Sequence, residues 1–189
     1  MVDDIIVVDD FLDEISFKKI KESLVRQNWY LTTDITSVDD IENPKKHYGF
    51  YSMIVRPEQP EKYITTPSSS MIFTLNEKIK SQFNFNTVER CRLDMTTYRG
   101  EDQITFKRHI DMEGFHYTSI YYTNECNAPT IIYNEKSTCS YIHPYLNLTI
   151  KEKVYPKENR LVVFPGNYIH TGMCATDVPY RILINSNFT

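Results

Sequence analysis

Between residues 87 and 188 the chain consists of short runs in which apolar and polar side chains alternate, with turn residues between the runs. Successive side chains of a strand leave opposite faces of its sheet, so this alternation predicts half-buried strands. Many such strands in succession are typical of a sandwich or an open barrel. The 14 Tyr and 10 Phe agree, because aromatic side chains suit pleated surfaces. We therefore expect a mainly β fold with flanking helices.

The run VERCRLDMTTYRG, residues 88–100, shows the pattern most clearly. Cys91, Leu93 and Met95 share one face of the predicted strand. The opposite face carries Arg90, Arg92, Asp94, Thr96 and Tyr98. A polar face of this kind is either solvated or lines a pocket, and the pattern leaves both open. We expect Arg92 and Asp94 to form an ion pair, with contact to a substrate as the alternative.

The first 86 residues mix strand and helix signals. We expect a strand over 5–8, a helix from Asp13, paired strands over 29–35 and 48–55, and a second helix over 68–83. Three prolines in residues 56–67 predict a surface loop, which is a candidate lid over a peptide. A length of 189 residues suits a single domain. In that domain, residues 1–86 would support a β core formed by residues 87–189.

Composition disfavours several classes of protein. The net charge of -4 disfavours nucleic-acid binding, which draws on clusters of Lys and Arg. The 4 cysteines show no CxxC spacing and no secretory signal is evident, so we expect reduced thiols and a cytoplasmic protein. No apolar run approaches the roughly 20 residues that span a bilayer. The bias toward Asn, Ile, Lys and Tyr is typical of an AT-rich genome, such as that of a bacterium or its phage.

Three residues form a candidate metal site. His109 and Asp111 lie two positions apart, so on an extended segment both side chains leave the same face and can converge on one ion. A distal His170 follows the apolar run and Pro-Gly turn of RLVVFPGNYIHTG. Two imidazoles and one carboxylate leave coordination positions open, which suits Fe(II) that must bind a chelating cosubstrate and dioxygen. A hydrolytic zinc site with the same ligands stays open.

The other histidines have simpler interpretations. We expect His116 to be a loop or strand histidine rather than a fourth ligand. His47 and His143 lie beside prolines, and we expect both to be solvated.

Four segments, HID, SIYYTN, RLVVFPGNYIHTG and PYRILINSNF, together resemble the prolyl-4-hydroxylase-like branch of the 2-oxoglutarate and Fe(II)-dependent dioxygenases. The N-terminal VVDDFLDEISFKKIKESL also resembles the way members of that branch begin, whereas residues 37–70 match nothing in particular. The resemblance implies a double-stranded β-helix, a cupin-like jelly roll, over nearly the whole chain. The chain departs from its relatives in NAPTIIYNE, where Ala128 and Pro129 replace a usual Gly-Gly pair.

The resemblance also implies roles for individual residues. His109, Asp111 and His170 would hold the iron. The far carboxylate of 2-oxoglutarate would bind three further residues, namely Arg181, Tyr98 and Tyr122. Tyr121 would face the other way. The guanidinium fork suits a carboxylate better than an ammonium group does.

The implied activity is hydroxylation coupled to decarboxylation of 2-oxoglutarate, with O2 as the oxidant and ascorbate as a candidate reductant. Related halogenases lack the carboxylate ligand, so Asp111 favours hydroxylation. The substrate class stays open, and a prolyl residue in a peptide or protein and a small molecule are the candidates. Two other functions also stay open, namely a noncatalytic jelly-roll module that binds a structural metal and a cupin-like metal enzyme that does not use 2-oxoglutarate.

Overall fold

The computed structural model describes residues 2–33, 35, 48–101, 103–143 and 146–189, and the polar segment 37–47 with His47 lies outside them. The helices are α1 (Glu14–Val25) and α2 (Ser69–Phe83). The strands are β1 (Ile6–Val8), β2 (Tyr30–Thr32), β3 (Gly49–Val55), β4 (Val88–Thr97), β5 (Tyr117–Tyr122), β6 (Thr130–Lys136), β7 (Ile150–Val154), β8 (Arg160–Pro165), β9 (Tyr168–Thr171) and β10 (Tyr180–Phe188).

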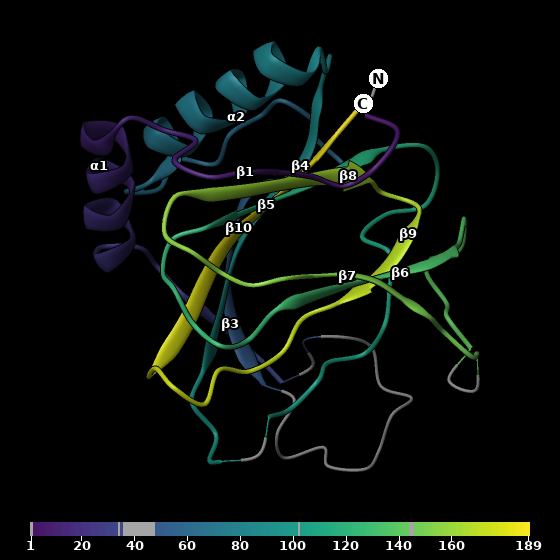
Figure 1. Ribbon diagram of the computed structural model, residues 1–189. Helices are drawn as coiled ribbons and strands as arrows, with labels where there is room; N and C mark the ends of the chain where they lie inside the picture. The colour runs from purple at the N-terminus through teal and green to yellow at the C-terminus, as the bar shows by residue number, and fades with distance from the viewer. Residues whose placement is uncertain (1, 34, 36–47, 102, 144–145) are drawn as a thin grey trace.

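The strands form two antiparallel sheets. The larger sheet has the order β1-β8-β5-β10-β4-β3-β2, and the smaller has the order β7-β6-β9. Figure 1 shows both helices on one side of the larger sheet and the smaller sheet on its other side. The expected mainly β jelly-roll fold with flanking helices is confirmed.

Both helices form where the sequence predicts them. The Asp13 side chain accepts a hydrogen bond from the Ser16 amide at 2.9 Å and so caps α1. The buried stripes consist of Ile20 and Leu24 on α1 and of Ile72, Leu75 and Ile79 on α2. No helix in the described residues is long and apolar enough to cross a membrane.

Alternation along the larger sheet separates two layers of core. One cluster joins the helices to the outer face of the sheet and includes Leu93 on β4, Tyr121 on β5 and Ile184 on β10. A second cluster lies between the sheets and includes Tyr122 and Leu183, the neighbours of Tyr121 and Ile184 in sequence. Because neighbours alternate between the two clusters, the period-two pattern of the sequence is the one that the sheet uses.

Residues before position 87 contribute strands as well as helices to this sheet. β1 pairs with β8 at one edge, while β3 pairs with β4 and carries β2 at the other edge. The predicted boundary between the supporting elements and the β core, at residue 87, therefore falls between two paired strands of one continuous sheet.

The proline-rich segment 56–67 is a surface loop, as predicted. Its Tyr63 accepts a hydrogen bond from Asn76 of α2 at 3.1 Å and packs against the outer core cluster. The Ile64 carbonyl accepts a hydrogen bond from Ser69 at the start of α2. These contacts hold the segment on the helical side of the sheet, and its interpretation as a lid over a peptide stays a prediction.

The turn between β8 and β9 fits tightly against a buried histidine. The Gly166 amide donates to the carbonyl of His116 at 2.8 Å, and His116 is only 2% exposed. A Cβ on Gly166 would lie 2.1 Å from Cδ2 of the His116 ring. His116 therefore packs against this turn, and it lies outside the cluster of candidate metal ligands found in the described residues, as predicted.

Replacing Gly166 with Ala should destabilise the protein, because the added methyl group must displace the His116 ring. We expect a loss of about 1–3 kcal/mol in the free energy of unfolding, measured by urea denaturation. The same change in a His116→Ala background should cost less, since the ring is gone. An equal loss in both backgrounds would contradict this account.

Candidate metal centre

The three side chains that the sequence singles out as metal ligands come together. One ligand atom from each of His109, Asp111 and His170 lies within 4.8 Å of the others. His170 belongs to β9, whereas His109 and Asp111 belong to the segment that leads into β5. The His109 amide donates to the His170 carbonyl at 3.0 Å, and the His170 amide donates back at 2.9 Å. This backbone bridge holds both imidazoles side by side.

Both imidazoles are oriented by a hydrogen bond from their other nitrogen. Nδ1 of His109 lies 3.0 Å from the Lys107 carbonyl, and Nδ1 of His170 lies 3.0 Å from the Tyr168 carbonyl. A carbonyl only accepts, so Nδ1 carries the proton and Nε2 is left with a free lone pair. The Nε2 atoms lie 3.9 Å and 3.6 Å from oxygens of Asp111. Nε2 of His170 is buried and has no hydrogen-bond partner, as expected of an atom that awaits a cation.

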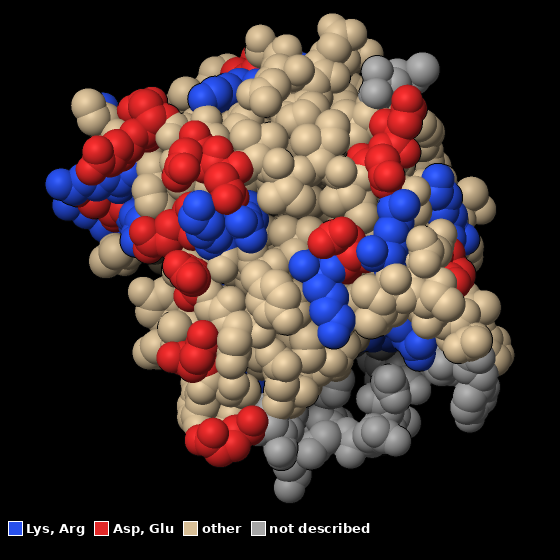
Figure 2. All heavy atoms as spheres, viewed as in Figure 1, with Lys and Arg blue, Asp and Glu red and all other residues tan. Residues whose placement is uncertain are grey.

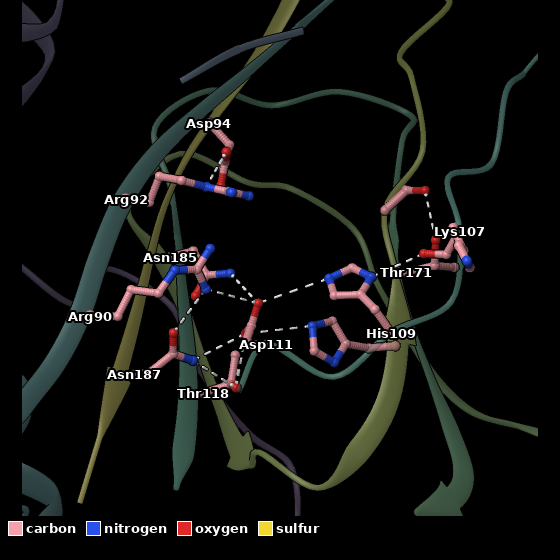
Figure 3. Close-up of polar contacts among 12 residues, drawn as sticks. Arg90, Arg92, Asp94, Lys107, His109, Asp111, Thr118, Thr171, Asn185 and Asn187 are labelled. Carbon is pink, nitrogen blue, oxygen red and sulfur yellow. Dashed lines mark hydrogen bonds and ion pairs between the residues drawn. The ribbon is translucent and has the colours of Figure 1, made fainter. Parts of the chain in front are cut away.

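The Asp111 carboxylate is held by donors from three strands. Those to Oδ1 are Arg90 Nη1 at 3.3 Å and Asn185 Nδ2 at 3.1 Å, and those to Oδ2 are Asn187 Nδ2 at 3.1 Å and Thr118 Oγ1 at 3.1 Å. Figure 3 shows these side chains around the carboxylate, on the side away from His109. The carboxylate is therefore fixed before any cation arrives.

Strand register explains why these donors meet. On β10, Asn187 is paired with Arg90 of β4 and with Thr118 of β5. These three residues form one row on the inner face of the sheet, and Asn185 belongs to the next row but one along β10. Parity along β4 predicted that Arg90 shares a face with Arg92. The amides and Thr118 were missed, because a single strand does not reveal which residues stand opposite it.

Electrostatics leave both residues of the HxD pair in the form that binds a cation. Burial and the neighbouring His170 lower the pKa of His109 to about 4. Burial alone would raise the pKa of Asp111, but His170 and the Arg90 guanidinium outweigh it and hold the pKa of this carboxyl well below its usual range. Near neutral pH, His109 is uncharged and Asp111 is ionised.

A hollow, which we call the inner hollow, opens beside the two histidines. Besides the histidines, its polar lining in the described residues consists of Arg92, Asp94, Thr96, Thr130, Thr171, Arg181 and Asn185. The polar face of β4 therefore lines a pocket, which decides between the two interpretations of that strand. The predicted ion pair also forms, with Arg92 Nε 2.7 Å from Asp94 Oδ1.

Arg181 contributes a buried guanidinium to this hollow. Arg181 is 4% exposed, and its Nη2 donates to Thr130 Oγ1 at 3.0 Å. The Tyr122 hydroxyl donates to the same oxygen at 2.7 Å, and its ring lies 5.6 Å from the guanidinium carbon. Nε of Arg181 has no acceptor, and no carboxylate of the described residues pairs with this side chain. Tyr121 faces the helices, as the resemblance implied.

Tyr122 itself is fully buried and is not among the residues that line the inner hollow, so the structure does not bring its hydroxyl to the place of the 2-oxoglutarate carboxylate as the resemblance implied. Burial raises the pKa of this hydroxyl. Thr130, the residue that links Tyr122 to Arg181, was missed by the sequence analysis.

The structure does not place Tyr98 in the inner hollow, and that part of the prediction is wrong. β4 ends at Thr97, which is paired with Tyr180, the first residue of β10. Beyond this point no strand pair preserves the parity that would turn Tyr98 inward. The side chain is 43% exposed, and its hydroxyl donates to Glu101 at 2.8 Å.

The turn that replaces the usual Gly-Gly pair is held by side chains. Asn127 Nδ2 donates to the Thr176 hydroxyl at 2.8 Å, and the Thr176 amide donates to Asn127 Oδ1 at 3.1 Å. Ala128 packs in a small buried cluster with Cys126 and Ala175. These contacts close the turn without glycine, and β6 begins at Thr130.

No protein-family model and no curated protein sequence matches the chain. Solved structures are similar to it over almost its full length. A 2OG-Fe(II) oxygenase family oxidoreductase from Burkholderia pseudomallei is 10% identical, with a TM-score of 0.67, covering 98% of this chain and 85% of that one. A prolyl hydroxylase from Trichoplax adhaerens, in complex with a hypoxia inducible factor peptide, is 15% identical with a TM-score of 0.63, covering 98% and 83%.

The epimerase SnoN from nogalamycin biosynthesis, solved with Fe3+, alpha ketoglutarate and nogalamycin RO, is also similar. It is 8% identical with a TM-score of 0.66, covering 99% of this chain and 79% of that one. At these identities the similarity establishes the fold, which is that of the 2OG-Fe(II) oxygenases, as the sequence resemblance implied.

The metal-free protein should lose stability in acid partly through His109. An unfolded histidine has a pKa of about 6.5. Between this pH and the folded pKa of about 4, His109 is protonated in the unfolded chain and neutral in the folded protein. This contribution is complete above about pH 6.5 and is lost as the pH falls toward the folded value of about 4. Its slope is at most ~1.4 kcal/mol per pH unit.

Chemical denaturation at a series of pH values measures this slope. His109→Gln should flatten the curve between pH 6.5 and pH 4, whereas His143→Gln, at an exposed position, should leave it unchanged. A curve that keeps its slope in His109→Gln would show that the site does not resist protonation.

Proposed function

We propose that this protein is a 2-oxoglutarate- and Fe(II)-dependent oxygenase that hydroxylates its substrate. One observation carries the proposal: the cluster of His109, Asp111 and His170 lies at a hollow that also contains the buried guanidinium of Arg181. Two histidines and a carboxylate leave coordination positions for a chelating ligand, and the guanidinium offers a partner for that ligand's far carboxylate.

The donor set supports a divalent cation such as Fe(II). Imidazole and carboxylate ligands together suit first-row metals, and a structural zinc site would more often be closed by a fourth ligand. No group in the described structure donates a hydrogen bond to the lone pair on His170 Nε2. Iron bound here would activate O2 for attack on a substrate C–H bond.

The lining of the inner hollow supports 2-oxoglutarate as the cosubstrate. A buried guanidinium without a carboxylate partner is costly unless a ligand supplies the counter-charge. Thr130 holds Nη2 of Arg181 and so limits the directions in which the remaining N–H groups can point. Phe106, Ile120 and Leu183 line the same hollow with apolar surface, which excludes water and strengthens the pairing of charges.

In the overall reaction, 2-oxoglutarate loses CO2 and becomes succinate. One oxygen atom of O2 enters succinate, and the other enters the substrate as a hydroxyl group. The protein holds both organic molecules in place and keeps water out. Asp111 as a ligand favours hydroxylation over halogenation. Ascorbate is a candidate reductant for idle enzyme.

The substrate is either a peptide or a small molecule. A prolyl residue is one candidate, since one similar structure is a prolyl hydroxylase in complex with a peptide. Another is an epimerase solved with nogalamycin RO, so the fold also serves small molecules. Formation of succinate from 2-oxoglutarate by the Fe(II)-loaded protein tests the proposal.

Arg181→Ala should raise the concentration of 2-oxoglutarate needed for half-maximal succinate formation roughly 10- to 150-fold, the range expected for loss of ~1.5–3 kcal/mol from a charged hydrogen bond. Iron affinity, measured separately, should stay near that of the wild type. Arg26→Ala, at an exposed position on the far side of the fold, is the matched control. Equal loss of iron and 2-oxoglutarate binding would show that Arg181 is structural.

His170→Ala should abolish tight iron binding and succinate formation together, because only two ligands would remain. Iron binding is measured by titration under anaerobic conditions, and His143→Ala serves as the control for loss of a histidine. Activity retained in His170→Ala would contradict the ligand assignment.

Anaerobic addition of 2-oxoglutarate to the Fe(II)-loaded protein separates the alternatives. Bidentate chelation of iron by a keto acid gives a visible charge-transfer absorbance. A metal enzyme that does not use 2-oxoglutarate, or a noncatalytic metal-binding module, would give neither this absorbance nor succinate.

A further inference from the structure

Arg90 of β4 places a buried guanidinium against the Asp111 carboxylate. The residue is 9% exposed, and its Nη1 donates to Asp111 Oδ1 at 3.3 Å. Figure 2 shows other basic side chains interspersed with acidic ones over the visible face, where water and salt screen their charges. A buried pair of charges is screened far less. The charge of Arg90 therefore acts strongly on Asp111.

Arg90 also determines which way the Asn187 amide points. Its Nη1 lies 3.1 Å from Asn187 Oδ1, and since a guanidinium only donates, the amide oxygen must face it. Asn187 Nδ2 then faces Asp111 Oδ2 and Thr118 Oγ1, at 3.1 Å from each. Figure 3 shows Arg90 and Asn187 beside the carboxylate, joined by these contacts. Arg90 therefore acts on both carboxylate oxygens, on Oδ1 directly and on Oδ2 through Asn187.

The neighbouring guanidinium on the same face of β4 is paired with a different acid. Arg92 Nε lies 2.7 Å from Asp94 Oδ1, and neither residue of that pair belongs to the cluster of candidate ligands. Arg90 instead shares the carboxylate that a bound cation would use. Any ion at the metal centre therefore binds a carboxylate whose negative charge is already partly balanced.

A guanidinium at a metal ligand affects ions of different charge unequally. Hydrogen bonds to the carboxylate weaken it as a donor to the metal, and positive charge nearby repels the ion. Both effects grow with the charge of the ion, so they disfavour a trivalent ion more than a divalent one. Building on the proposed function, in which the ion is iron, we propose that Arg90 is a positioning residue that acts through Asp111 and Asn187 to favour Fe(II) over Fe(III).

This preference has a consequence for the idle protein. Fe(III) differs from Fe(II) by one electron, which passes from the iron to an oxidant such as O2 and must be returned by a reductant before Fe(II) is available again. A site that favours Fe(II) needs that reductant less often.

The test is the reduction potential of the iron-loaded protein, measured by potentiometry with mediators, without 2-oxoglutarate and at constant pH. Arg90→Gln should lower the potential by at least about 59 mV, which corresponds to a tenfold shift toward Fe(III) in the ratio of affinities for the two ions. Arg90→Lys keeps the charge and should keep most of the potential. Arg26→Gln removes an exposed positive charge and should leave the potential at the wild-type value.

Asn187→Ala tests the indirect route, and it keeps the proposal testable if Arg90→Gln does not fold. It removes the donor to Asp111 Oδ2 but leaves the charge of Arg90, so it should lower the potential by a smaller step. Circular dichroism shows whether each variant is folded. An unchanged potential in folded Asn187→Ala would overturn the part of the proposal that runs through Asn187.

A folded Arg90→Gln variant that keeps the wild-type potential would overturn the proposal and show that Arg90 only stabilises the fold. An equal fall in Arg26→Gln would overturn it too, because the effect would then follow net charge. So would wild-type protein that binds no iron. The measurement uses neither 2-oxoglutarate nor a substrate. If iron binds but no succinate forms, the proposed oxygenase function is rejected, while the potential still decides the role of Arg90.

Discussion

The pairing of β10 with β4 on one side and β5 on the other is the constraint on which the site depends. Arg181, Asn185 and Asn187 lie on one face of β10, and each meets a defined neighbour on β4. A shift of one residue would turn all three toward the helices and bring apolar side chains to the metal centre. Ile182 and Ile184, which leave the opposite face of β10 and pack in the outer core cluster, oppose such a shift.

This arrangement also explains how the protein tolerates a charged group in its interior. Asp111 is almost fully buried, yet its two oxygens accept from four donors, one of them a guanidinium. A buried carboxylate is costly without such partners. The donors come from strands that pair with one another. Formation of the sheet therefore brings together the hydrogen bonds that offset the cost of burying the Asp111 carboxylate.

Much of this could be predicted from local pattern. Period-two alternation gave the outer and inner faces of β4, and the order of His109, Asp111 and His170 gave the cluster. The prediction for Tyr98 was wrong because side chains alternate between the two faces only while the strand is paired, and β4 ends at Thr97, one residue earlier. Thr130 and Asn187 could not be found, because their roles depend on which strands lie side by side, and a single sequence does not state register.

The hydroxyl of Thr130 limits which residues can occupy position 130. Its oxygen is the acceptor for both the Tyr122 phenol and the Arg181 guanidinium. Serine at position 130 would keep that oxygen. Valine, with nearly the same shape, would leave two buried donors, the Tyr122 hydroxyl and Arg181 Nη2, without an acceptor. Among distant homologues, the residue at position 130 should therefore co-vary with the residues at positions 122 and 181.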